Sequence, residues 1–221
     1  MLNYDFTHIA HVIAFAYIMA AELPVYFAAR MALDPNQNGA TRIVAARLAK
    51  WTGAITSTAL VFMLPLGVVL GISLGVHDLA DPSWLTATWI VTASWLALLA
   101  AAEFVPGAWG RRLFVTETVF RIVNGLGQVY DGISALMGMG MTQADWLAIK
   151  ILVYGLVLLI SAWVRWRTRP ARYAIAGTAG SVAPTDLNAD ATASLKAVGP
   201  AVLLTTLLVA LAAWMGISKP F

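Results

Sequence analysis

The sequence contains no cysteine, and only 11% of its 221 residues are charged, whereas 60% are hydrophobic. The absence of cysteine excludes disulfide bonds and thiolate metal sites. Soluble domains carry about 25% charged residues, so this composition, with a mean hydropathy of +0.78, indicates a polytopic membrane protein. The net charge of +3 is too small for a nucleic-acid-binding surface. We therefore expect the lipid bilayer, and no nucleic acid, as the surroundings of this chain.

The sequence also lacks the motifs of common soluble enzymes, such as a glycine-rich phosphate loop, a nucleophile elbow or a zinc-binding spacing. A cleaved signal peptide is not expected either, because no Lys or Arg precedes the first apolar stretch. That stretch is also longer than the roughly 7–15 residues of a signal peptide. Candidate functional residues are therefore expected in the apolar segments.

Five apolar segments reach the length of about 20 residues that a helix needs to cross a bilayer. They cover residues 6–32, 50–76, 84–105, 146–165 and 197–217. A sixth segment, at 113–140, is long enough but visibly polar. We expect residues 1–221 to form a single all-α membrane domain, in which residues 168–195 are a flexible cytoplasmic loop because they are small and polar.

The distribution of Lys and Arg predicts the orientation, because cytoplasmic loops collect these residues. Basic residues follow the first and third segments, whereas the loop after the second segment has none. The strongest basic run, from Arg165 to Arg172, follows residues 146–165. It faces the cytoplasm only if residues 113–140 cross the membrane. We therefore expect six spans in a bacterial cytoplasmic membrane, with both termini outside; the alternative is five spans, with 113–140 lying in the interface.

The polar residues of segment 113–140 are regularly spaced, at intervals of four, three, four and three. They are Glu117, Arg121, Asn124, Gln128 and Asp131. This spacing puts all five on one face of a helix, and Glu117 and Arg121 form an i,i+4 pair. We expect the stripe to face the interior of the bundle, where Glu117, Arg121 and Asp131 are candidates for chemical roles.

Four ionisable residues of the apolar segments are further candidates, because such groups in a membrane mark candidate sites. His8, His11 and Glu22 belong to the first segment. The histidines are three residues apart, and Glu22 follows His11 after about three turns of the same helical face. Glu22 is a candidate proton relay, or a partner for an arginine such as Arg121. The fourth residue is Lys150.

Lys150 follows the expected interfacial residue Trp146 by four positions and lies roughly 6 Å inside the membrane boundary. A lysine at this depth can extend toward the surface. The predicted topology nevertheless puts Lys150 in the outer half of the membrane, at the level of the histidines. A cofactor can then lie between His11 and Lys150 if their helices are neighbours. Imidazole is a good iron ligand, and a lysine amine ligates only when it is neutral.

Four blocks of sequence resemble the HemJ-type protoporphyrinogen oxidases and their CopD-like relatives. They are HIAHVIAFAYIMAAELPVYF, RLAKWTGAITSTALVFMLPLGVVLG, DWLAIKILVYGLVLL and the ending AVGPAVLLTTLLVALAAWMGISKPF. Residues 83–140 are an insertion of two expected helices that this family lacks. The resemblance implies haem b held by His11 with Lys150, and His8 beside them. It also implies oxidation of protoporphyrinogen IX in porphyrin biosynthesis, with electrons passing to quinone.

Two other functions compete with this interpretation. Met137, Met139 and Met141 are thioethers at the expected outer end, and with His8 and His11 they suit a copper-binding or copper-transport protein. Methionines at a helix end also simply fill space. The third possibility is a non-catalytic membrane subunit that docks a partner subunit, or a second copy, through the inserted helices.

Overall fold

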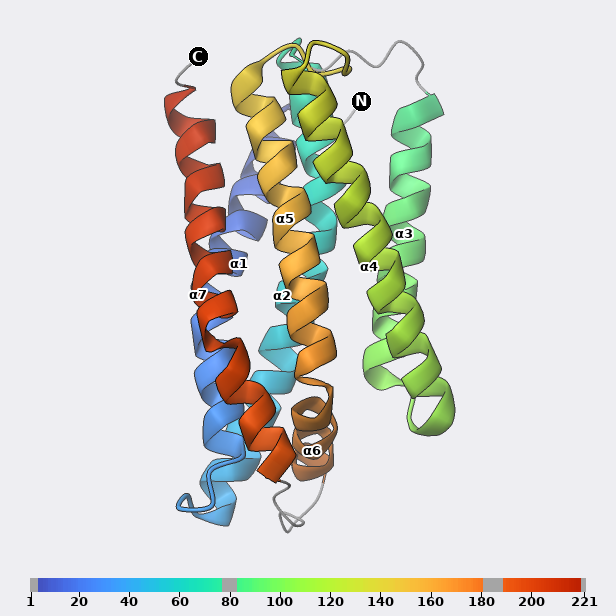
Figure 1. Ribbon diagram of the computed structural model, residues 1–221. Helices are drawn as coiled ribbons and strands as arrows, with labels where there is room; N and C mark the ends of the chain where they lie inside the picture. Colours follow the sequence, from blue (N-terminus) through green and yellow to red (C-terminus); the bar gives the residue numbers. More distant parts are fainter. Residues whose placement is uncertain (1–3, 77–82, 181–188, 220–221) are drawn as a thin grey trace.

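The computed structural model describes residues 4–76, 83–180 and 189–219, for residues 177–180 the backbone alone, and these residues form seven helices (Figure 1). The helices are α1 (Tyr4–Ala32), α2 (Gly39–Ser73), α3 (Ser83–Phe104), α4 (Gly107–Leu136), α5 (Asp145–Arg167), α6 (Arg169–Gly180) and α7 (Ala189–Ser218). No strand occurs in these ranges. The protein is therefore an all-α helix bundle, as the sequence predicts.

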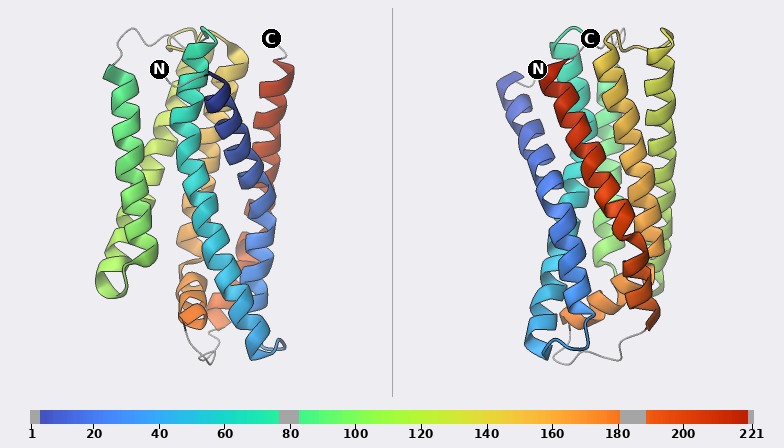
Figure 2. Two further views of the ribbon diagram at one scale, coloured as in Figure 1. Left: turned by 180° about the vertical axis from the view of Figure 1, so that it is seen from behind. Right: turned by 60° about the vertical axis from the view of Figure 1, so that its left-hand side comes forward.

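Six of the helices are long and run roughly along one axis, whereas the short α6 lies at one end (Figures 1 and 2). The first and last described residues lie at the opposite end, together with the α4–α5 connection. We call the end with the termini the outer end and the end with α6 the inner end, after the predicted orientation. Helices α1, α2, α3, α5 and α7 are long and apolar enough to cross a membrane, which makes this a multi-pass membrane protein.

Helix α4 is too polar to count as a span by composition, but it lies lengthwise beside α5 and packs against it (Figure 1). The polar stripe explains this composition. Glu117 and Arg121 are buried, and Asn124, Gln128 and Asp131 are half-buried. On the opposite face, the apolar side chains are exposed, and these are Val119, Val123 and Leu126. The stripe therefore faces the bundle as predicted, and this placement favours six crossings over an interfacial α4.

Glycines bring α4 and α5 close together. A Cβ added at Gly132 would lie 2.7 Å from the backbone nitrogen of Leu152. One added at Gly155 would lie 2.7 Å from the backbone nitrogen of Val129. Small residues at such positions allow helix backbones to approach in a membrane, where no hydrophobic force drives helices together. Helices α3 and α4 are thus tied into the bundle through α5.

The prediction of a flexible loop over residues 168–195 is wrong. Residues 169–180 form α6, and α7 already begins at Ala189; residues 181–188 lie outside the described ranges. Ala171, Ile175 and Leu195 pack with alanines of α1 and α2 in an apolar cluster at the inner end. The small side chains that suggested a loop instead permit close packing. Their spacing at 171 and 175 is that of one helical face.

Candidate functional site

Glu117 is the centre of a buried polar network in the inner half of the bundle. Its carboxylate lies 2.7 Å from Arg121, which confirms the predicted i,i+4 pair, and both side chains are at most 1% exposed. The indole nitrogen of Trp95 donates a hydrogen bond of 3.1 Å to the same carboxylate from α3. Arg121 also donates to Ser161 of α5. A buried charge is tolerated only when it is paired and hydrogen-bonded, and Glu117 is both.

Two further arginines and a second carboxylate extend this network toward the inner end. Arg165 at the end of α5 bridges Glu103 of α3, at 2.9 Å, and Glu117, at 3.1 Å. Arg172 of α6 also pairs with Glu103. The contact from Nε of Arg165 to Glu117 is an ion pair that lacks the alignment of a hydrogen bond. The Nη2 atom of Arg165 has no hydrogen-bond partner among the described residues. The network therefore ties α3, α4, α5 and α6 together.

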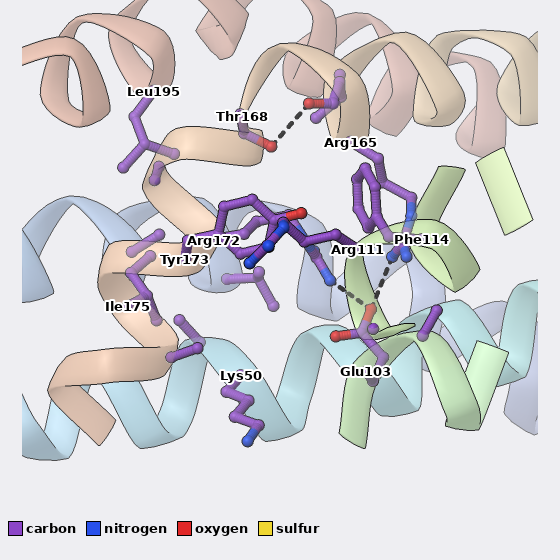
Figure 3. A pocket seen from close by; sticks show the side chains of 18 of the residues that line it. Lys50, Glu103, Arg111, Phe114, Arg165, Thr168, Arg172, Tyr173, Ile175 and Leu195 are labelled. Atoms are coloured by element: carbon purple, nitrogen blue, oxygen red, sulfur yellow. Dashed lines mark hydrogen bonds and ion pairs between the residues drawn. The ribbon is translucent and has the colours of Figure 1, made fainter. Parts of the chain in front are cut away.

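A pocket of about 470 Å³ lies beside this network at the inner end (Figure 3). Arg165 and Arg172 reach Glu103 from two different helices, and Phe114 lies next to them. Glu22 also lines the pocket. It forms no ion pair with Arg121, so that predicted pairing is wrong, although the two charges lie within electrostatic reach. Glu22 thus belongs to the inner pocket.

His11 lies in the outer half of the bundle and is half-buried, whereas His8 is exposed and stacks on Tyr4. The Nδ1 atom of His11 is buried and has no hydrogen-bond partner within the described ranges. Gly67 of α2 faces the imidazole, since a Cβ added there would lie 3.9 Å from Cε1. A buried polar atom without a partner is uncommon and calls for an explanation.

Lys150 extends toward the outer end rather than across the bundle. Its Nζ lies 5.9 Å from the centre of the Trp146 ring, and Nζ of Lys219 lies 5.5 Å from the same ring. Trp146 is only 8% exposed, so the expectation of an interfacial ring at this position is wrong. The indole instead packs inside the protein and holds two ammonium groups near one another through cation–π contacts.

His11 and Lys150 lie within electrostatic reach of each other. Their helices, however, are not a closely packed pair in the described chain; α7 packs against both α1 and α5. A Cβ added at Gly216 of α7 would lie 2.8 Å from Nζ of Lys150. Two glycines, Gly67 and Gly216, therefore flank the two side chains, and no bulky residue occupies either position.

The remaining predicted site residues are Asp131 of α4 and three methionines of the α4–α5 connection. Gly132 packs on Ala148 and Leu152, so its neighbour Asp131 is at the depth of Lys150, yet no salt bridge joins the two. Met137, Met139 and Met141 are all exposed. No group of three His, Asp or Glu side chains in the described ranges is arranged to hold a metal ion. The copper interpretation stays a prediction without a structural observation in its favour.

Sequence reasoning missed five members of the inner network, namely Trp95, Glu103, Ser161, Arg165 and Arg172. It assigned Arg165 and Arg172 to a basic run facing the cytoplasm, whereas Arg165 is only 5% exposed and is part of the buried network. One signal was available, since Glu103 is the single ionisable residue of an otherwise apolar helix. Such a residue in a membrane span is a candidate site by default. Its partners, 62 and 69 residues away in sequence, follow only from the fold.

Comparison of this chain with protein-family models, curated proteins and solved structures finds no match.

Proposed function

We propose that this protein binds haem b in the outer half of its bundle and acts as a membrane oxidoreductase, and that His11 would hold the iron. The observation that carries the proposal is the imidazole of His11, whose buried Nδ1 has no partner in the described chain. An imidazole whose buried nitrogen has no hydrogen bond is suited to ligation, because imidazole is a common ligand of haem iron.

The surroundings of His11 support a flat ligand. Gly67 and Gly216 border the region from α2 and α7, and α1 and α5 do not pack closely on each other. Lys150 and Lys219 supply two positive charges at the outer edge of this region. Haem b carries carboxylate groups at one edge, and an ammonium group pairs with a carboxylate. Lys150 therefore holds the porphyrin edge in this proposal, while His11 holds the metal.

The reaction suggested by the family resemblance is oxidation of a porphyrinogen, with quinone as the acceptor. Bound haem would supply the one-electron chemistry. The residues of this chain would bind and orient the porphyrin through His11, Lys150 and Lys219, and the apolar side chains of α1, α2 and α7 would exclude water. Asp131, at the same depth on α4, is the nearest candidate of the polar stripe for accepting a proton.

An absorption spectrum of the full chain, purified after expression with ample haem, tests the proposal. We expect a Soret band that His11→Ala abolishes or shifts and that His8→Ala leaves in place, because His8 is exposed. Gel filtration of each variant shows whether it is folded. No Soret band in the folded wild-type protein, or an unchanged band in folded His11→Ala, contradicts the proposal. Stoichiometric copper in the same sample would favour the copper-binding alternative.

A further inference from the structure

The inner pocket contains more positive than negative charge. Lys50, Arg111, Arg165 and Arg172 line it, against the carboxylates Glu22 and Glu103. Glu103 is already engaged by Arg165 and Arg172. Lys50 and Arg111 have no ion-pair partner among the residues that the structure describes, and Lys50 only lies over the ring of Phe104. Two cations of the wall are thus left uncompensated.

Arg165 is a second and independent sign of a ligand. It is 95% buried, being 5% exposed, and it lines the pocket. Its Nη2 has no hydrogen-bond partner in the described ranges. An arginine presents its donors as a rigid fork that matches the oxygens of a phosphate or carboxylate. A buried guanidinium with one unused donor at a cationic wall is suited to an anion.

Most of the remaining wall is apolar. Val25, Phe114, Val164 and Val202 line it from four helices, α1, α4, α5 and α7. A volume of about 470 Å³ is within the range of small-molecule sites. The ligand therefore has an anionic group at one end and an apolar body at the other. Basic pockets between membrane helices at the cytoplasmic side bind the phosphates of lipid headgroups.

We propose that the inner pocket binds a phosphate group attached to an apolar body, with Arg111 and Lys50 contacting the phosphate oxygens and the buried guanidinium of Arg165 adding positive charge beside them. The phosphate comes from an anionic lipid of the adjacent leaflet or from a soluble phosphate compound. This site is independent of the haem proposal, because it lies at the opposite end of the bundle and uses none of the same residues. Glu22 also lines this pocket, so its carboxylate limits how many negative charges a bound ligand can carry.

Neighbouring arginines on α4 provide a matched test. Arg111 lines the pocket, whereas Arg112 is not among its lining residues and lies over the ring of Trp109. Both are exposed and both lie in the first turns of α4, so Arg111→Gln and Arg112→Gln remove the same charge from the same region. Lys50→Gln is the second pocket variant. Arg165 is left intact, because its removal would take one ion-pair partner from each of the buried carboxylates Glu103 and Glu117.

The experiment has two arms, both with the full chain. In detergent, thermal unfolding is followed as inorganic phosphate is added at constant ionic strength, with chloride as the comparison. In nanodiscs of phosphatidylglycerol or phosphatidylcholine, retained lipid is counted by native mass spectrometry. We expect phosphate or phosphatidylglycerol to bind, about tenfold more weakly in Arg111→Gln and Lys50→Gln, and unchanged in Arg112→Gln.

Each outcome either supports the proposal or overturns it. Stabilisation by phosphate alone identifies a soluble source, and retention of phosphatidylglycerol alone identifies the lipid. Absence of both effects in the wild-type protein overturns the proposal. Equal losses in Arg111→Gln and Arg112→Gln also overturn it, because the binding would then depend on general surface charge. All variants are compared by their melting temperature without added anion, so that a folding defect is recognised.

Discussion

The two ends of the bundle use ionisable residues in opposite ways. At the inner end, Glu103, Glu117 and their arginines pair with one another across four helices. At the outer end, His11, Lys150 and Asp131 form no ion pair within the described chain, although they lie at similar depth. Charges that pair with each other hold helices together. Polar groups that are kept in a bundle without a partner are more readily explained by a ligand.

The largest effect is expected from breaking the inner network at its centre. Glu117→Gln removes the charge that Arg121 and Arg165 share, and it leaves two buried guanidinium groups with reduced compensation. Loss of one partner of a buried ion pair costs about 3–5 kcal/mol. Unfolding of the purified protein by denaturant in detergent measures this loss. A change below about 1 kcal/mol would show that the network does not hold the helices.

A smaller loss of stability is expected from a substitution where α4 packs against α5. In Gly132→Ala the added methyl group would meet the backbone of Leu152 and Ala148, at 2.7 and 2.9 Å, and backbone atoms cannot move aside as a flexible side chain does. Overpacking of this kind costs about 1–3 kcal/mol. Gly127→Ala is the control, because no atom lies within 4 Å of the added group. Equal stability of the two variants would mean that α4 and α5 do not pack this closely.

The smallest effect on stability is expected at the outer end. In Lys150→Met the side chain stays unbranched, becomes one atom shorter and loses a cation–π contact with Trp146, worth about 0.5–1 kcal/mol. The free energy of unfolding of the haem-free variant should therefore lie within about 1 kcal/mol of that of the haem-free wild-type protein. Denaturant unfolding of both proteins provides the comparison. A loss as large as that of Glu117→Gln would show that Lys150 is part of the fold, and the contrast between the two ends would fail.

The fold is readable from the sequence to a large extent, because membrane helices are set by length and apolarity. Spacing alone identified the inward face of α4 and the pair of Glu117 with Arg121. Helix α6 was missed because small polar residues are common to loops and to close helix contacts, and only the packing of Ala171 and Ile175 distinguishes the two. The start of α2 at Gly39 was missed for a different reason: Asn38 caps the helix through the backbone N–H of Thr41, ahead of the apolar region.

The candidate sites were harder to predict from the sequence than the fold. His11 and Lys150 stand out as polar residues in apolar segments, so sequence reasoning found them. The salt bridges of Glu103 with Arg165 and Arg172 join α3 to α5 and α6, and no local spacing reports such a contact. The same is true of Glu22, because the pocket that it lines is formed by α2, α3, α4, α5, α6 and α7 as well as by α1.

The most direct test is the haem content per folded chain of two variants, one from each end. In His11→Ala we expect little or no haem in a protein that keeps its stability. In Glu103→Gln, which breaks the pairs with Arg165 and Arg172, we expect a less stable protein whose folded fraction keeps its haem. Haem content that falls in Glu103→Gln and persists in His11→Ala would contradict the assignment of the ligand to the outer end and of the stabilising network to the inner end.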